Sequence, residues 1–390
     1  MIAASLMSRR FLRNVRITAI LLALAAPVRS PAAEPEPDLA RLKAHVTLLA
    51  SPEYQGRRGE GGRKAAQYLI DAFQALELEP LFDGQYTQEI PGKEPGEVIG
   101  RNIGARLVGR DPVLREEWVI ISAHFDHLGV RNGVLYPGAD DNASGVAMLL
   151  EAARCLTVSA ERPRRSVMFV GFDLEEIGLF GSRYFAEHPP VPLDKVRLFL
   201  TADMIGRSLG GVCDPYVFVI GSEYAPGLRD WIRQDEANAS LAIGLLGADV
   251  IGTRSDYGPF RTRKIPFLFF STGENPCYHK PTDSADTLNY PKLEAISRLM
   301  VSVLRQAASA DTVPRWTREP SYPFSEARTV RDVLRCMLDH RDQLKIGAPQ
   351  LLLMRNTLRN LDGIIARGSI TGAERAAMVR AAQIILVSVL

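Results

Sequence analysis

The sequence predicts an α/β fold: a mixed, mostly parallel central sheet with helices on both faces, and a helical extension at the C-terminus. Three observations lead to this prediction. From about residue 100, apolar strand-like runs alternate with segments of helical spacing, as expected of a sheet covered on both faces. Past Pro314 the remaining patterns are helical only. The 390 residues are 46% hydrophobic and 24% charged, an ordinary globular composition that supplies a sizeable core.

Residues 1–33 are predicted to be a signal peptide. Four arginines precede a ten-residue apolar run at 17–26, and small residues follow it at 30–33, an order typical of export signals. The run is too short to cross the hydrocarbon core of a bilayer as a helix; a buried N-terminal helix is the alternative. We therefore expect a periplasmic or secreted protein with no stable membrane anchor once the signal is removed.

The charge balance gives no reason to expect a nucleic acid as partner. The signal segment carries five arginines and no acidic residue, so its removal changes the formal net charge from +2 to −3. A chain so close to neutrality lacks the basic surface that nucleic-acid binding requires.

Two helices are predicted before residue 80, at 38–50 and 62–78, with a glycine- and arginine-rich loop at 56–62 between them. The four cysteines show no C-x-x-C spacing, which excludes a zinc ribbon and a thioredoxin-like motif. In an oxidising compartment they allow one disulfide, and the sequence does not choose the pair.

The central part of the chain predicts five strands with helices between them. The strand-like runs are 117–123, 166–172, 197–202, 215–220 and 266–271. The helical patterns are 143–156, 178–187, 223–236 and 291–309. After Pro314, the helical patterns are 326–345, 348–361 and 371–388.

Acidic and histidine residues follow four of the predicted strands or begin the next helix. These residues are His124, Asp126, Asp140, Asp141, Glu175, Glu176, Asp203 and His279. Taken singly, each has an ordinary explanation, such as a helix N-cap or a solvated turn. Together they would meet at the carboxyl edge of the sheet, where ligands bind in open α/β folds. So many anions at one edge would repel each other unless cations neutralise them, so the pattern predicts a metal site.

The mixture of imidazole and carboxylate groups, without thiolates, favours zinc and related ions over calcium or magnesium. Five candidate ligands exceed the three that one catalytic zinc usually takes from the protein. They fit two metal ions that share a bridging carboxylate and a bridging water.

These motifs resemble the co-catalytic zinc exopeptidases of metallopeptidase family 28. The similarity runs from about residue 46 to 310, and five ordered motifs with matching intervals carry it. They are His124-x-Asp126, Gly138-Ala-Asp-Asp-Asn-x-Ser-Gly145, Glu175-Glu176-x-Gly-Leu-x-Gly-Ser182, Asp203-Met204 and Tyr278-His279-x-Pro-x-Asp-Ser284. Two positions differ from the family: Tyr257 stands where His is common, and Glu60 where Thr is frequent. We assign no role to Tyr257 and expect Glu60 to be a solvated loop charge.

The resemblance implies two zinc ions and a ligand set. Asp141 would bridge the two ions. His124 and Asp203 would complete one coordination shell, and Glu176 and His279 would complete the other.

Two further residues would act in catalysis. Asp126 would orient His124 by accepting its free ring N–H, and Glu175 would be the general base. Neighbouring residues that leave a strand point in opposite directions, which allows Glu176 to bind metal while Glu175 faces the water.

The resemblance thus implies an exported zinc aminopeptidase that hydrolyses N-terminal residues from peptides through a dizinc-bridged hydroxide. Its substrates would be peptides with a free N-terminus. The predicted organisation is a signal peptide (1–33), a catalytic domain (34–315) and a C-terminal helical extension (316–390). The alternatives are a carboxypeptidase or dipeptidase of the same family, a single-zinc glutaminyl cyclotransferase, and a non-catalytic binding module. The cyclotransferases usually carry an insertion after the Glu pair, and this chain has none there.

Overall fold

The computed structural model describes residues 34–232 and 238–389. The predicted signal peptide lies outside the described residues and stays a prediction. Within the described part, nine strands form one sheet: β1 (Glu79–Pro80), β2 (Thr87–Pro91), β3 (Val98–Leu107), β4 (Trp118–His124), β7 (Ser166–Phe172), β8 (Val196–Ala202), β9 (Tyr216–Ile220), β10 (Ala242–Leu246) and β11 (Phe267–Ser271). A separate hairpin contains β5 (Gly129–Arg131) and β6 (Val134–Tyr136).

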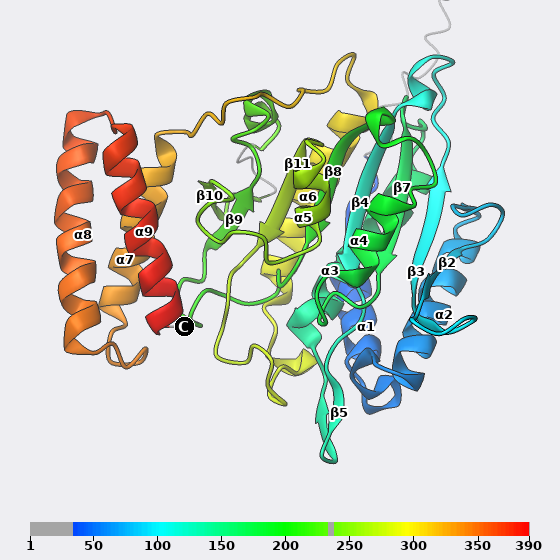
Figure 1. The fold of residues 1–390 in the computed structure, drawn as a ribbon, viewed down its shortest axis with the longest axis horizontal. Coiled ribbons are helices and arrows are strands. Elements are labelled where there is room, and N and C mark those ends of the chain that lie inside the picture. The colour runs from blue at the N-terminus through cyan, green and yellow to red at the C-terminus, as the bar shows by residue number, and fades with distance from the viewer. Residues whose placement is uncertain (1–33, 233–237, 390) are drawn as a thin grey trace, which may run out of the picture. The chain divides into compact units, whose positions relative to one another are not determined.

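The sheet is mixed and mostly parallel at its centre, which confirms the predicted fold class. Its strand order is β1-β3-β7-β4-β8-β11-β9-β10, with β2 paired to β3 (Figure 1). Strands β7, β4, β8 and β11 are parallel, whereas β3 and β9 run antiparallel to their central neighbours. The four parallel strands therefore end at the same edge of the sheet.

Helices cover both faces of this sheet. The described helices are α1 (Leu39–Leu49), α2 (Glu60–Ala75), α3 (Gly145–Thr157), α4 (Phe180–Glu187), α5 (Tyr257–Thr262), α6 (Tyr290–Ser309), α7 (Ser325–Asp339), α8 (Ala348–Arg367) and α9 (Gly372–Val389). Helices α1, α2, α3 and α6 share one apolar core with one face of the sheet. Helices α4 and α5 share a second core with the opposite face.

The alternation of side chains along β4 explains why its sequence is a continuous apolar run. Val119 and Ile121 point into the first core, while Ile120 points into the second. Because helices bury both faces, a central parallel strand has no solvent side and needs no polar alternation.

One predicted helix was wrong within the described residues. In place of a helix over 223–236, the chain forms a short 3-10 helix, η5 (Pro226–Asp230), and residues 233–237 lie outside the described part. Pro226 begins this turn, but Gly227 follows it and is a poor helix former. No helix among the described residues combines the length and apolarity that a membrane span needs.

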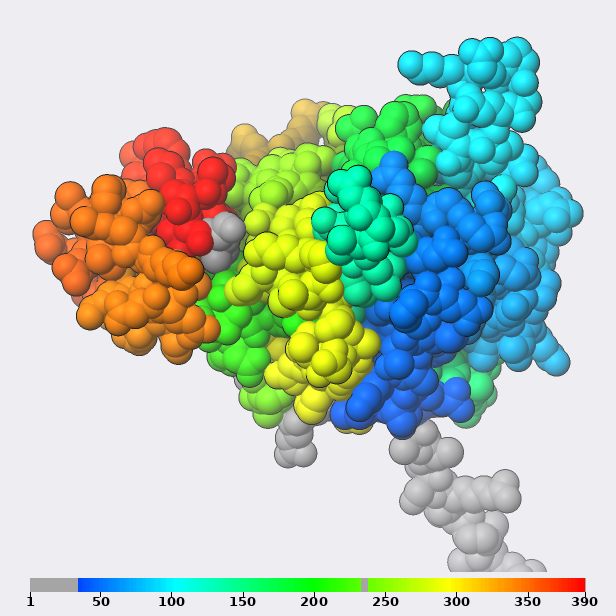
Figure 2. Space-filling model, turned by 90° about the horizontal axis from the view of Figure 1, so that it is seen from below, coloured from blue at the N-terminus to red at the C-terminus, as the bar shows by residue number. Residues whose placement is uncertain are grey.

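The C-terminal helices pack onto the β9–β10 side of the sheet. Leu334 of α7 and Ile385 of α9 lie in one apolar cluster with Phe218 of β9 and with Val250, which lies in the loop after β10. Figure 2 shows the C-terminal helices, in orange and red, at one end of the described chain. A glycine permits the close approach of α7 to β10, since a Cβ on Gly244 would lie 2.7 Å from a methyl carbon of Thr329. The predicted domain boundary at 315/316 stays a prediction.

Candidate metal centre

The predicted site residues lie at the edge where the parallel strands end. His124 is the last residue of β4, and Asp203 directly follows β8. Asp141 lies in the irregular helical segment that leads into α3. Glu175 and Glu176 follow β7 by three and four residues. The structure brings these side chains together with His279, which belongs to the loop after β11.

Asp141 lies between two groups of donor atoms. Its Oδ1 is 3.4 Å from Nε2 of His124, which is also 3.4 Å from Oδ1 of Asp203. Its other oxygen, Oδ2, is 3.2 Å from Nε2 of His279, which is 2.9 Å from Oε2 of Glu176. One oxygen thus faces each group, the placement that a bridging carboxylate requires.

The two neighbouring glutamates separate into different groups. Donor atoms of Glu175, His124 and Asp203 lie within 4.8 Å of one another, whereas Glu176 belongs with Asp141. Both residues lie in the segment that follows β7 and not in a strand, so the conformation of this loop places them in different groups.

Asp126 connects β4 to the glutamate loop. Its Oδ1 is 3.5 Å from Nδ1 of His124, and its carboxylate accepts hydrogen bonds from the backbone N–H groups of Glu175 (3.0 Å) and Glu176 (3.3 Å). Asp126 therefore fixes the position of the His124 ring relative to the backbone of the two glutamates. The assigned roles of these residues stay predictions, because the geometry gives proximity and not function.

His127 is a residue of the site to which the sequence interpretation gave no role. Its Nδ1 is 2.6 Å from Oε1 of Glu176, and its ring joins Glu176 and Asp141 in one group of possible ligands. Burial lowers the pKa of His127 to about 4, so we assign a neutral ring whose Nδ1–H donates to Glu176. Its Nε2 is buried and has no hydrogen-bond partner among the described residues. The only signal in the sequence was its place in the motif His124-Phe-Asp-His127.

A buried arginine holds the loops beneath the site. The Arg57 guanidinium is fully buried and donates five hydrogen bonds of 2.7 to 3.1 Å to backbone carbonyls. The acceptors belong to Leu49, Phe125, Pro137, Gly138 and Asp141. Burial lowers the pKa of Arg57, and the nearby Asp141 carboxylate opposes that shift. Arg57 thereby fixes the backbone beside Asp126 and the backbone at Asp141.

The crowding of charge in the cluster shifts the pKa values of its members. Burial alone would lower the pKa of His124, but the carboxylates of Glu175 and Asp203 hold it well above its ordinary value. Burial also opposes charge on His279, and its hydrogen bonds with Asp141 and Glu176 nevertheless raise its pKa to about 10. Burial raises the pKa of Glu175 well above its usual range. Divalent cations would balance the negative charge of the cluster.

The two positions that depart from the family pattern lie in ordinary surroundings. The Tyr257 hydroxyl donates to the carbonyl of Gly252 at 2.5 Å, and its ring stacks on Phe267. Glu60 lies in the first turn of α2, is exposed, and pairs with Arg63 at 2.5 Å. Neither contact assigns a role in the site.

Comparison with known families identifies the region that carries the site. Residues 102–304 match the sequence profile described as Peptidase family M28. This segment includes all seven predicted catalytic and metal-binding residues, from His124 to His279.

Two curated relatives share about a quarter of their aligned residues with this chain. Aminopeptidase YwaD of Bacillus subtilis is 27% identical over 206 residues, which cover 50% of this chain and 42% of that protein. Leupeptin-inactivating enzyme 1 of Streptomyces exfoliatus is 26% identical over 324 residues, which cover 76% of this chain and 68% of that protein. The aligned part therefore spans less than half of the first relative.

Solved structures share the fold at low sequence identity. The Legionella pneumophila LapA aminopeptidase matches with a TM-score of 0.55 and 21% identity, covering 70% of this chain and 72% of that one. The Porphyromonas gingivalis glutaminyl cyclase matches with a TM-score of 0.53 and 21% identity, covering 68% and 97%. These likenesses show a common fold and do not by themselves select one reaction.

Proposed function

Because the chain belongs to peptidase family M28, we propose that it is a zinc-dependent aminopeptidase that removes N-terminal residues from peptides. One observation carries this proposal: Asp141 extends one oxygen toward His124 and the other toward His279. Export to the periplasm or the exterior is part of the same proposal and depends on the arginine-rich segment 1–33.

The donor set fits two zinc ions. His124 and Asp203 would hold one ion, Glu176 and His279 the other, and Asp141 would be shared. Imidazole and carboxylate are groups that zinc prefers, and Asp141 presents one oxygen to each of the two groups. When bound, zinc would polarise the scissile carbonyl and lower the pKa of a water molecule.

Glu175 would move the proton during hydrolysis. Its carboxylate lies with His124 and Asp203, and burial raises its pKa, so it binds a proton readily. It would accept a proton from the attacking water and deliver it to the amine of the departing product. The hydrogen bonds that Asp126 accepts from the backbone of residues 175 and 176 would keep that carboxylate in place.

The acceptor groups of the site support a substrate with a free amine. Four carboxylates, those of Asp141, Glu175, Glu176 and Asp203, lie among the ligand groups. Two zinc ions would neutralise their net charge, and the carboxylate oxygens that bind no metal would accept hydrogen bonds from an N-terminal amine.

A substrate panel tests the proposal. The purified chain, loaded with zinc, would be given free-amine aminoacyl anilides, dipeptides, N-blocked peptides, and peptides that begin with glutamine, each with and without a chelator. We expect chelator-sensitive hydrolysis of the free-amine substrates only. Cleavage of N-blocked peptides alone would indicate a carboxypeptidase. Hydrolysis confined to dipeptides would indicate a dipeptidase, and pyroglutamate formation without hydrolysis a cyclotransferase.

A further inference from the structure

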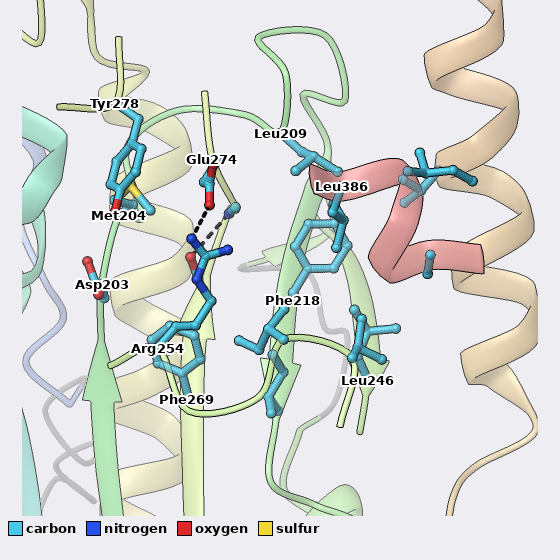
Figure 3. Close-up of a pocket in the computed structure, with 18 of the residues that line it drawn as sticks. Asp203, Met204, Leu209, Phe218, Leu246, Arg254, Phe269, Glu274, Tyr278 and Leu386 are labelled. Atoms are coloured by element: carbon cyan, nitrogen blue, oxygen red, sulfur yellow. Dashed lines mark hydrogen bonds and ion pairs between the residues drawn. The ribbon is translucent and has the colours of Figure 1, made fainter. Parts of the chain in front are cut away.

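A pocket begins at the candidate metal centre and reaches the C-terminal helices (Figure 3). Asp141, Glu175, Asp203 and His279 line its polar end. Its other end is apolar, and strands β9 and β10 together with helices α7 and α9 supply the side chains. These include Phe218, Leu246, Leu334, Met337, Ile385 and Leu386.

The far wall of this pocket belongs to the part of the chain outside the family match. The match ends at residue 304, whereas α7 begins at Ser325 and α9 ends at Val389. The shape of the pocket therefore depends on helices that the family comparison does not cover.

Ion pairs fix these helices to the catalytic region. Arg375 of α9 binds Asp249 at 2.7 Å and Glu326 of α7 at 2.5 Å. Glu326 is buried and also accepts a hydrogen bond of 2.8 Å from the backbone N–H of Gly247, in the loop after β10. Gln383 of α9 donates to the carbonyl of Asp249 at 2.8 Å. Both helices are thus held against the loop that lines the pocket.

The pocket offers no separate charged partner along its wall. Among its described lining residues, Arg254 and Glu274 are the charged side chains outside the metal-ligand cluster, and they bind each other at 2.7 Å (Figure 3). A lysine or glutamate side chain that entered the apolar end would lose hydration without gaining a charge of opposite sign. An aliphatic or aromatic side chain would gain from leaving water.

We propose that this pocket binds a bulky apolar side chain of the N-terminal residue of the substrate, and that α7 and α9 determine this preference. The inference rests on the proposed aminopeptidase function, because that function places the first residue beside the metal centre. The C-terminal helices would then contact the substrate directly and help to select it.

Substitutions of Leu386 test the inference. Leu386 is a half-buried residue of α9 that lines the pocket, whereas its neighbour Val387 is 85% exposed and does not. We would compare Leu386→Glu, Leu386→Ala and the control Val387→Glu with the wild-type chain. The assay is kcat/KM for anilides of leucine, phenylalanine, alanine and lysine, with Leu-Ala and Ala-Leu dipeptides to locate the preferred position.

The wild type should favour leucine and phenylalanine over alanine and lysine by at least about tenfold, the scale on which apolar pockets discriminate. Leu386→Glu should raise the ratio of lysine to leucine turnover by about tenfold or more. Leu386→Ala, the milder change, should lower turnover of leucine about tenfold and leave that of alanine within about twofold. Val387→Glu should retain the wild-type ratios.

Several results would overturn the inference. Wild-type substrate ratios in both Leu386 variants, or an equal loss on every substrate including alanine, would show that α9 does not shape the pocket. A preference seen only in the second residue of the dipeptides would place another part of the substrate there. Wild-type hydrolysis without apolar preference would refute this inference and leave the proposed function intact, whereas no hydrolysis of any free-amine substrate would refute both.

Discussion

Exchanging each of the two adjacent glutamates for glutamine should produce opposite defects. Glu175→Gln and Glu176→Gln remove the same charge, one residue apart, from the same buried cluster. Glu176 contacts two histidines, His279 at 2.9 Å and His127 at 2.6 Å. Its substitution should therefore weaken zinc binding, with metal content falling below two ions per chain after dialysis.

Glu175→Gln should instead keep its zinc and lose turnover. A positioned acid or base typically contributes 10²–10⁴-fold to the rate, so kcat should fall by about that factor. This loss corresponds to roughly 3–5 kcal/mol of transition-state stabilisation, at about 1.4 kcal/mol for each factor of ten. Because the side chain stays polar and nearly the same size, packing around His124 and Asp203 should not change.

The assay pairs metal analysis of each dialysed variant with steady-state kinetics on leucine anilide. Addition of excess zinc should restore much of the activity of Glu176→Gln and none of that of Glu175→Gln. Donor atoms of Glu175, His124 and Asp203 lie within 4.8 Å of one another, so Glu175 could also bind a metal ion. Loss of zinc from Glu175→Gln, with full metal content and no turnover in Glu176→Gln, would show that the two roles are reversed.

Three further predictions follow from the contacts around the site. Arg57→Met leaves five buried carbonyls without their donor, so the free energy of unfolding, measured in urea, should fall by about 3 kcal/mol or more. The control Arg58→Met changes an exposed neighbour and should alter this free energy by less than about 0.5 kcal/mol. Equal losses in the two variants would contradict the role of Arg57. Burial lowers the pKa of Lys292 to about 8, below its value in an unfolded chain, so the folded protein binds fewer protons between pH 8 and about 10.5. Stability should therefore rise with pH across that window in the wild type relative to Lys292→Met, and parallel profiles would refute this. Removing the metal with a chelator should lower the Tm and abolish turnover, and zinc should restore both; an unchanged Tm would mean that no ion binds the folded cluster.

The central strands could be predicted because their burial leaves a strong pattern. Strand β4 is apolar throughout, since helices cover both of its faces. Strands β3 and β10 were not predicted. Gly100 and Gly104 interrupt β3, and β10 is short, contains Gly244 and is only partly buried. Their pairing partners, far away in sequence, determine that they are strands.

The site residues could be predicted where an acidic or histidine side chain stands at the end of an apolar strand. His124 and Asp203 stand at the ends of apolar runs, and the parallel sheet brings those ends together. The part played by His127 depends on Glu176, 49 residues away, and no local pattern indicates that contact. Likewise, Leu386 has the spacing of any core residue in an amphipathic helix, so only the packing of α9 shows that it lines the pocket.

The direct test of the account is the zinc content of the purified, active chain, measured by elemental analysis while activity is titrated with zinc. A bridging role of Asp141, as proposed, predicts maximal activity at two zinc ions per chain, with the metal held through dialysis. Full activity in a preparation that contains no transition metal would contradict the account, and saturation at one ion would contradict the bridging role of Asp141.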